Sequence, residues 1–200
     1  MKPIFSKDSK NQLMKGGQIN QEFVSRDGRS VRIRSPRWED LDLMLEFIND
    51  LVSEKLKDPG FGILSDQKQT RQSEATWLSQ RLVDIETGRS VFATAFAEGK
   101  LVGQCEVSRG RANDEFHHGS LGISVSKEYR DEGIGRELMK IVLRECKRAD
   151  FKTIELEAFG NNKRAIHLYE SVGFKLVGII PKKMYRVGHY YDGAVMSIIL

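Results

Sequence analysis

Hydrophobic and polar positions repeat at two different periods along the chain, and the two periods alternate. Spacing of every second residue predicts a first strand at residues 29–34, with Val31 and Ile33 on one face. Spacing of three and four residues predicts helices at residues 38–51, 70–87, 134–149 and 162–172. Further strand-like segments lie at residues 90–97, 100–108, 118–125, 152–159, 175–181 and 194–200. This order predicts one α/β domain with a mixed sheet.

The N-terminal residues differ from the rest of the chain in periodicity and charge. Residues 1–25 are polar and aperiodic, and we expect them to form a flexible extension ahead of a single domain at residues 26–200. Four lysines against one aspartate give residues 1–20 a charge of +3, out of +4 for the whole chain of 200 residues. The domain itself is thus almost neutral, which argues against an extended nucleic-acid-binding face.

The composition is that of an ordinary soluble protein, with 40% hydrophobic and 30% charged residues. No apolar run reaches the roughly 20 residues of a membrane span, and the N-terminus carries no signal-peptide pattern, so a cytoplasmic location is expected. The two cysteines, Cys105 and Cys146, sit among apolar residues and are expected to be buried and unpaired. No metal-ligand spacing occurs among the His, Cys, Asp and Glu residues, which predicts no metal.

A glycine-containing turn joins the strand at residues 118–125 to the helix that begins at Ile134. Unpaired amides and the positive end of the dipole make a helix N-terminus a binding site for anions, and glycine lets the backbone approach closely. The turn lacks the Lys-Ser/Thr ending of a P-loop and the third glycine of a dinucleotide fingerprint. The sequence of the turn is Arg130-Asp131-Glu132-Gly133-Ile134-Gly135. This pattern fits either a pyrophosphate site or a turn without a ligand.

A second segment lies one strand further along the chain. It places Asn162, Ala165 and Tyr169 on one helix that closes on Gly173-Phe174. Together the Arg-x-x-Gly-x-Gly turn and the Asn-x-x-Ala-x-x-x-Tyr segment resemble the GNAT superfamily of N-acetyltransferases. The resemblance in element order extends over residues 29–200.

The resemblance implies a fold and a cosubstrate. The fold would be a mixed, mostly antiparallel sheet of about seven strands with splayed central strands, flanked by about four helices. Acetyl-CoA would lie with its pantetheine arm on the backbone of Ile123 and Val125, and its pyrophosphate on the amides of the turn. The cofactor-binding residues implied in this way are Ile123, Val125, Arg130, Asp131, Glu132, Gly133, Ile134, Gly135, Arg136, Asn162 and Tyr169.

Catalysis would be direct attack of a neutral amine on the thioester. The resemblance nominates Tyr169 as the proton donor to the departing thiolate; packing against the sheet is the alternative role for this residue. Glu106 is the candidate base, or else part of a solvated sheet face. Weaker candidates are His117, His118 and Glu157, and the acceptor would be walled by residues 53–69 and 182–191, with Tyr185, His189, Tyr190 and Tyr191 among them.

The acceptor is expected to be a small-molecule amine or a protein N-terminus, because residues 190–197 resemble members with such acceptors. No nucleic-acid or membrane partner is expected. A homodimer is one of the oligomeric states that the sequence leaves open. The competing hypothesis is a CoA-binding regulatory module without catalysis, which the presence of Tyr169 disfavours.

Overall fold

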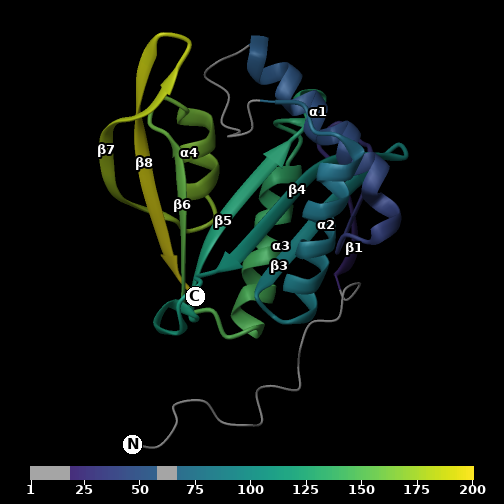
Figure 1. Ribbon diagram of the computed structural model, residues 1–200, viewed down its shortest axis with the longest axis horizontal. Coiled ribbons are helices and arrows are strands. Elements are labelled where there is room, and N and C mark those ends of the chain that lie inside the picture. The colour runs from purple at the N-terminus through teal and green to yellow at the C-terminus, as the bar shows by residue number, and fades with distance from the viewer. Residues whose placement is uncertain (1–18, 58–66) are drawn as a thin grey trace, which may run out of the picture.

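A single eight-stranded sheet forms the centre of the computed structural model, which describes residues 19–57 and 67–200 (Figure 1). The strand order is β1-β2-β3-β4-β5-β6-β8-β7, and β5 with β6 is the parallel pair in this otherwise antiparallel sheet. The strands are β1 (Asn20–Val24), β2 (Ser30–Arg34), β3 (Ser90–Ala97), β4 (Lys100–Arg109), β5 (His118–Val125), β6 (Thr153–Phe159), β7 (Lys175–Arg186) and β8 (His189–Ile199).

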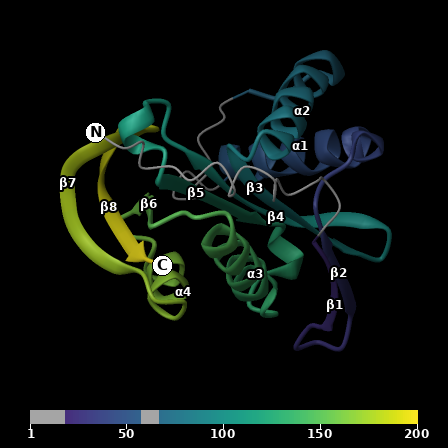
Figure 2. The same cartoon turned by 90° about the horizontal axis from the view of Figure 1, so that it is seen from below.

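Helices cover both faces of the sheet, as Figure 2 shows with α1 and α2 on one side and α3 and α4 on the other. Their bounds are α1 (Leu41–Lys57), α2 (Arg71–Glu86), α3 (Ile134–Arg148) and α4 (Lys163–Glu170). Within residues 19–57 and 67–200, none of the helices has the length and apolar composition needed to span a bilayer. The mixed α/β fold predicted from the sequence is thereby confirmed.

Two hydrophobic clusters anchor these layers. One joins α1 and α2 to the sheet around Met44, Leu78 and Phe92, and the larger one packs α3 against the other face. Cys105 and Cys146 lie in the larger cluster with no exposed surface, and both are free thiols. Burial raises the pKa of both thiols, which keeps them protonated. The prediction that they are buried and unpaired is confirmed.

The predicted elements need correction at three places. Asn20–Val24, predicted to belong to a flexible extension, instead pairs with β2 as an edge strand whose side chains are mostly exposed. The last two strands are longer than predicted and form one hairpin, in which β7 continues beyond Pro181. Because β7 lies at the edge of the sheet, a residue without an N–H is tolerated there. Residues 1–18 and 58–66 of the predicted extension and loop lie outside the described residues.

The strands β5 and β6 separate soon after they meet. They pair only from His118 with Thr153 to Ser120 with Glu155, although β5 continues to Val125. Figure 1 shows the two strands close together near the C-terminus and diverging toward the opposite end. The splayed central strands implied by the family resemblance are therefore present.

Candidate active site

In the part of β5 that diverges from β6, every second residue directs its N–H and C=O groups away from β4. Ser126 N donates to Val102 O at 2.9 Å, and Gly110 N donates to the His118 carbonyl at 3.2 Å. Since these bonds show that even-numbered residues along β5 and at its end face β4, the peptide groups of Ile123 and Val125 face the side from which β6 has departed. An extended ligand between the separated strands would find backbone partners at these two residues.

The turn after β5 presents a run of backbone donors. Among the described residues, no hydrogen-bond acceptor is present for the amides of 131–136, whereas Arg130 N donates to Lys127 O at 3.4 Å. Asp131 and Gly133 adopt positive φ angles of 67° and 90°, which bends the chain into a concave row of N–H groups. The same turn opens α3, so the positive end of the helix dipole points in this direction. This arrangement fits a pyrophosphate.

Glycine is required in this turn for two different reasons. At Gly133 a Cβ would meet no atom within 4 Å, so the positive φ is what favours glycine. At Gly135 a Cβ would lie 3.2 Å from Leu168 Cδ2 and 3.7 Å from side-chain atoms of Ile123 and Val125. The absence of a side chain at Gly135 therefore lets α3, α4 and β5 approach one another beside the row of amides.

Neighbouring segments hold the turn in this shape. Arg26, in the connection between β1 and β2, donates its amide to Glu132 O at 3.1 Å and its Nη1 to Asp131 O at 3.1 Å. These contacts engage the carbonyl groups of the turn and leave the amides available. Arg130 pairs with Glu54 of α1, with 2.6 Å between Nη2 and Oε2, and its Nε donates to Val125 O at 2.9 Å. The Arg130 side chain thus ties α1 to the turn.

Tyr169 lies on α4 and packs edge-on against Phe174, with 6.4 Å between ring centroids. The residue is 9% exposed, and its hydroxyl makes no hydrogen bond to any described residue. Desolvation, with a smaller contribution from Cys105, raises the pKa of Tyr169 from 10.0 to about 12. A phenol in this state is protonated at neutral pH and has its proton available for transfer.

Asn162 is the N-cap of α4. Its Oδ1 accepts a hydrogen bond from Ala165 N at 3.1 Å, which satisfies one of the donors at the start of the helix. The cap fixes the start of the helix that carries Tyr169, two turns further on. A cofactor contact of Asn162 stays a prediction.

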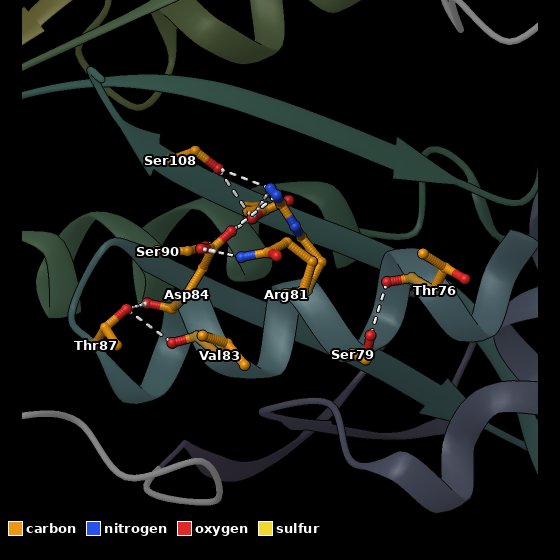
Figure 3. A network of polar contacts seen from close by, with 10 residues as sticks. Thr76, Ser79, Arg81, Val83, Asp84, Thr87, Ser90 and Ser108 are labelled. Carbon is orange, nitrogen blue, oxygen red and sulfur yellow. Dashed lines mark hydrogen bonds and ion pairs between the residues drawn. The ribbon is translucent and has the colours of Figure 1, made fainter. Parts of the chain in front are cut away.

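Glu106 takes part in a polar cluster on the opposite face of the sheet. Its Oε1 accepts hydrogen bonds from Ser90 Oγ at 2.7 Å and Ser108 Oγ at 2.9 Å, and Arg81 Nη1 lies 3.2 Å away. Figure 3 shows Arg81 of α2 extending toward Ser108, with Asp84 beside it. Glu106 is thus engaged by a cation and two hydroxyl groups, and its role as the base remains a prediction.

The weaker candidates are distributed around the sheet. His118 lies at the end of β5 that still pairs with β6, where its Nδ1 is 2.9 Å from Thr153 Oγ1. Glu157 on β6 forms an ion pair with Lys183 at 3.1 Å. Tyr185 and Tyr190 contact each other across the β7–β8 hairpin, with 4.9 Å between ring centroids. Within residues 19–57 and 67–200, no group of three His, Cys, Asp or Glu residues is arranged to hold a metal ion.

A cavity lies between α1, α2 and β4, and one of its lining residues, Gln69, belongs to the segment at residues 53–69 that was predicted to wall the acceptor site. Its volume is about 290 Å³. Glu74 of α2 lies in its wall and is 5% exposed, and burial raises the pKa of this carboxyl group. A helical pattern alone gives no sign that a glutamate faces inward, because charged residues usually occupy the solvent side. The lining residues are Met44, Ile48, Gln69, Glu74, Trp77 and Gln104.

A sheet whose central strands separate just before a helix N-terminus with unpaired backbone amides is the arrangement of a class of protein, the acyltransferases that use coenzyme A. Residues 51–174 match the model of the acetyltransferase (GNAT) family, and the chain belongs to this family.

Two known proteins are similar in sequence to part of this chain. The L-amino acid N-acetyltransferase AaaT of Escherichia coli is 29% identical over 128 residues, which are 62% of this chain and 76% of that protein. The N-alpha-acetyltransferase RimI of Mycobacterium tuberculosis is 33% identical over 107 residues, 52% of this chain and 63% of that protein.

Solved structures share the fold over most of the chain. The ribosomal-protein-alanine N-acetyltransferase of Brucella melitensis has a TM-score of 0.74 and 24% identity, covering 84% of this chain and 99% of that chain. The yncA protein of Salmonella typhimurium, solved with acetyl-CoA, has a TM-score of 0.73 and 20% identity, covering 85% and 94%.

Proposed function

We propose that this protein transfers the acetyl group of acetyl-CoA to a primary amine, either of a small molecule such as an amino acid or of a protein N-terminus. The observation that carries the proposal is the row of free amides at residues 131–136, placed directly after the diverging end of β5. Family membership supports acetyl-CoA as the donor. The names of AaaT and RimI support the two kinds of acceptor.

The residues that would hold the donor follow from the geometry. Amides of the turn would bind the pyrophosphate, as free N–H groups at helix N-termini do. The peptide groups of Ile123 and the N–H of Val125 would bind the pantetheine arm, because they face away from β4, whereas Val125 O already accepts from Arg130 Nε. Arg130, held by Glu54, would shape the site without binding phosphate through its guanidinium group.

The reaction would proceed by direct attack. The amine nitrogen forms a bond to the thioester carbonyl carbon, and the bond from that carbon to sulfur breaks. An ammonium group is protonated at neutral pH, so a proton must first pass to a carboxylate or to water. The phenol of Tyr169 would donate a proton to the departing thiolate; its raised pKa keeps that proton in place at neutral pH, and no described residue hydrogen-bonds to its hydroxyl.

The test is a panel of amines, including amino acids, amino acid amides and short peptides, assayed for release of the CoA thiol from acetyl-CoA. The proposal expects thiol release that depends on at least one amine class. Tight binding of CoA with no release across the whole panel would instead indicate a CoA-binding module without catalysis.

A further inference from the structure

Glu74 is an exception among the buried acids of the described residues. These acids are Asp40, Glu74 and Glu145, each less than 9% exposed. Asp40 forms an ion pair with Arg34, and Glu145 accepts from Arg144 and Arg148. Within residues 19–57 and 67–200, no hydrogen bond or ion pair reaches the Glu74 carboxylate. The Glu74 side chain is 5% exposed and its carboxylate borders the cavity, so a cation that enters the cavity finds a carboxylate with no competing donor among the described residues.

The surroundings of Glu74 indicate what that ligand is. Glu74 is the ionisable residue in the wall of the cavity, and Met44 and Ile48 of α1 supply an apolar side. Trp77, one turn after Glu74, is held edge-on to Phe92 with 5.9 Å between ring centroids. A carboxylate beside aliphatic and aromatic groups is complementary to an ammonium group that carries an apolar chain.

The position of the cavity connects it to the proposed reaction. Gln104 contributes the β4 side of the cavity and lies opposite Ser124 of β5 in the register of the sheet. Ser124 stands between Ile123 and Val125, the residues whose peptide groups face the separated strands. The cavity therefore adjoins the sheet at the level where the donor's pantetheine arm would lie.

We infer that Glu74 is the counter-ion of the acceptor's ammonium group, whose proton passes to this carboxylate or to water before attack, and that this cavity is the acceptor site for an amine with an apolar side chain. The inference rests on the proposed acetyl transfer for its biological meaning. Its physical content, selective binding of an ammonium group by Glu74, can be measured without turnover.

The test compares two probes in the CoA-loaded protein at pH about 7, where an α-amino group is mostly protonated. L-Leucinamide carries the ammonium group, and 4-methylpentanamide has the same skeleton without it. Calorimetry on the wild type should show leucinamide binding about tenfold to a hundredfold more tightly, the range of a charge-assisted hydrogen bond. Glu74→Gln should remove this preference.

The matched control is Glu46→Gln, which removes the same charge from an exposed position on α1. It should keep the preference for leucinamide. Glu74→Gln should unfold at the same denaturant concentration as the wild type or a higher one, because the Glu74 carboxylate has no partner among the described residues to lose. A wild type without the preference, a Glu74→Gln variant that keeps it, or a marked loss of stability in that variant would each overturn the inference.

Parallel turnover assays separate this inference from the proposed function. If the wild type acetylates leucinamide and Glu74→Gln does so with an unchanged KM, the role of Glu74 is wrong and acetyl transfer stands. If no amine is acetylated while leucinamide binding still depends on Glu74, the cavity assignment stands and the proposed function is wrong.

Discussion

Replacing Tyr169 by phenylalanine removes one oxygen atom and tests the proposed proton donor. The hydroxyl of Tyr169 makes no hydrogen bond to any described residue, so its loss breaks no internal contact. We expect the stability at neutral pH to stay within about 0.5 kcal/mol of the wild type. We expect kcat to fall by about a hundredfold or more, since a positioned general acid contributes about 10²–10⁴ in rate.

The alkaline stability of the same variant gives a second, independent measure. Burial raises the pKa of Tyr169 from 10.0 to about 12, so ionisation is easier in the unfolded chain than in the fold. The stability is therefore complete below pH about 10 and falls as the pH rises through about 12, by about 2–3 kcal/mol for a shift of this size. Tyr169→Phe should lack this part of the alkaline loss.

Thiol release from acetyl-CoA measures kcat, and denaturant unfolding at pH about 9 and about 11.5 measures the stability difference. Tyr185→Phe is the matched control, because Tyr185 is 66% exposed on the β7–β8 hairpin. This control should leave kcat and the alkaline profile unchanged. A Tyr169→Phe enzyme with wild-type kcat would refute the proton-donor role, and an unchanged alkaline profile would refute the argument from burial.

Two further substitutions test the contacts around the site. Glu54→Gln removes one charge of the largely buried pair with Arg130, and should lower the free energy of unfolding by about 1.5–3 kcal/mol in denaturant titrations; an unchanged midpoint would contradict the anchoring role. Glu106→Gln weakens the cluster with Arg81 and should lower stability by about 1–3 kcal/mol, and, since Glu106 is the predicted base, it should also lower kcat. A variant that loses stability but keeps kcat would contradict the base role of Glu106.

The features that the sequence predicted are those encoded by neighbouring residues. The glycine turn opens α3, and the segment from Asn162 to Tyr169 forms α4, because each pattern is contiguous and its periodicity is strong. Buried apolar stripes also placed β3, β4 and β5 correctly.

The features that the sequence did not predict depend on contacts between distant residues. Glu54 and Arg130 are 76 residues apart, and Arg26 and Asp131 are 105 apart, so no local pattern indicates either contact. Glu74 faces inward only because α1 and β4 close over that side of α2. The strand β1 was missed because an edge strand with mostly exposed residues has no alternating pattern.

The most direct test of the central claim is equilibrium binding of CoA to Gly135→Glu. A side chain at this position would point toward Leu168, Ile123 and Val125, beside the amides of the turn. One negative charge about 6 Å from another, at an effective dielectric of about 20, costs about 3 kcal/mol, or about a hundredfold in affinity.

Gly178→Glu is the control, since a Cβ at Gly178 meets no atom within 4 Å and the residue lies on β7. Calorimetry on variants shown to be folded should find CoA binding about a hundredfold weaker in Gly135→Glu and unchanged in Gly178→Glu. Equal CoA affinity in a folded Gly135→Glu protein would contradict the assignment of the pyrophosphate site to this turn.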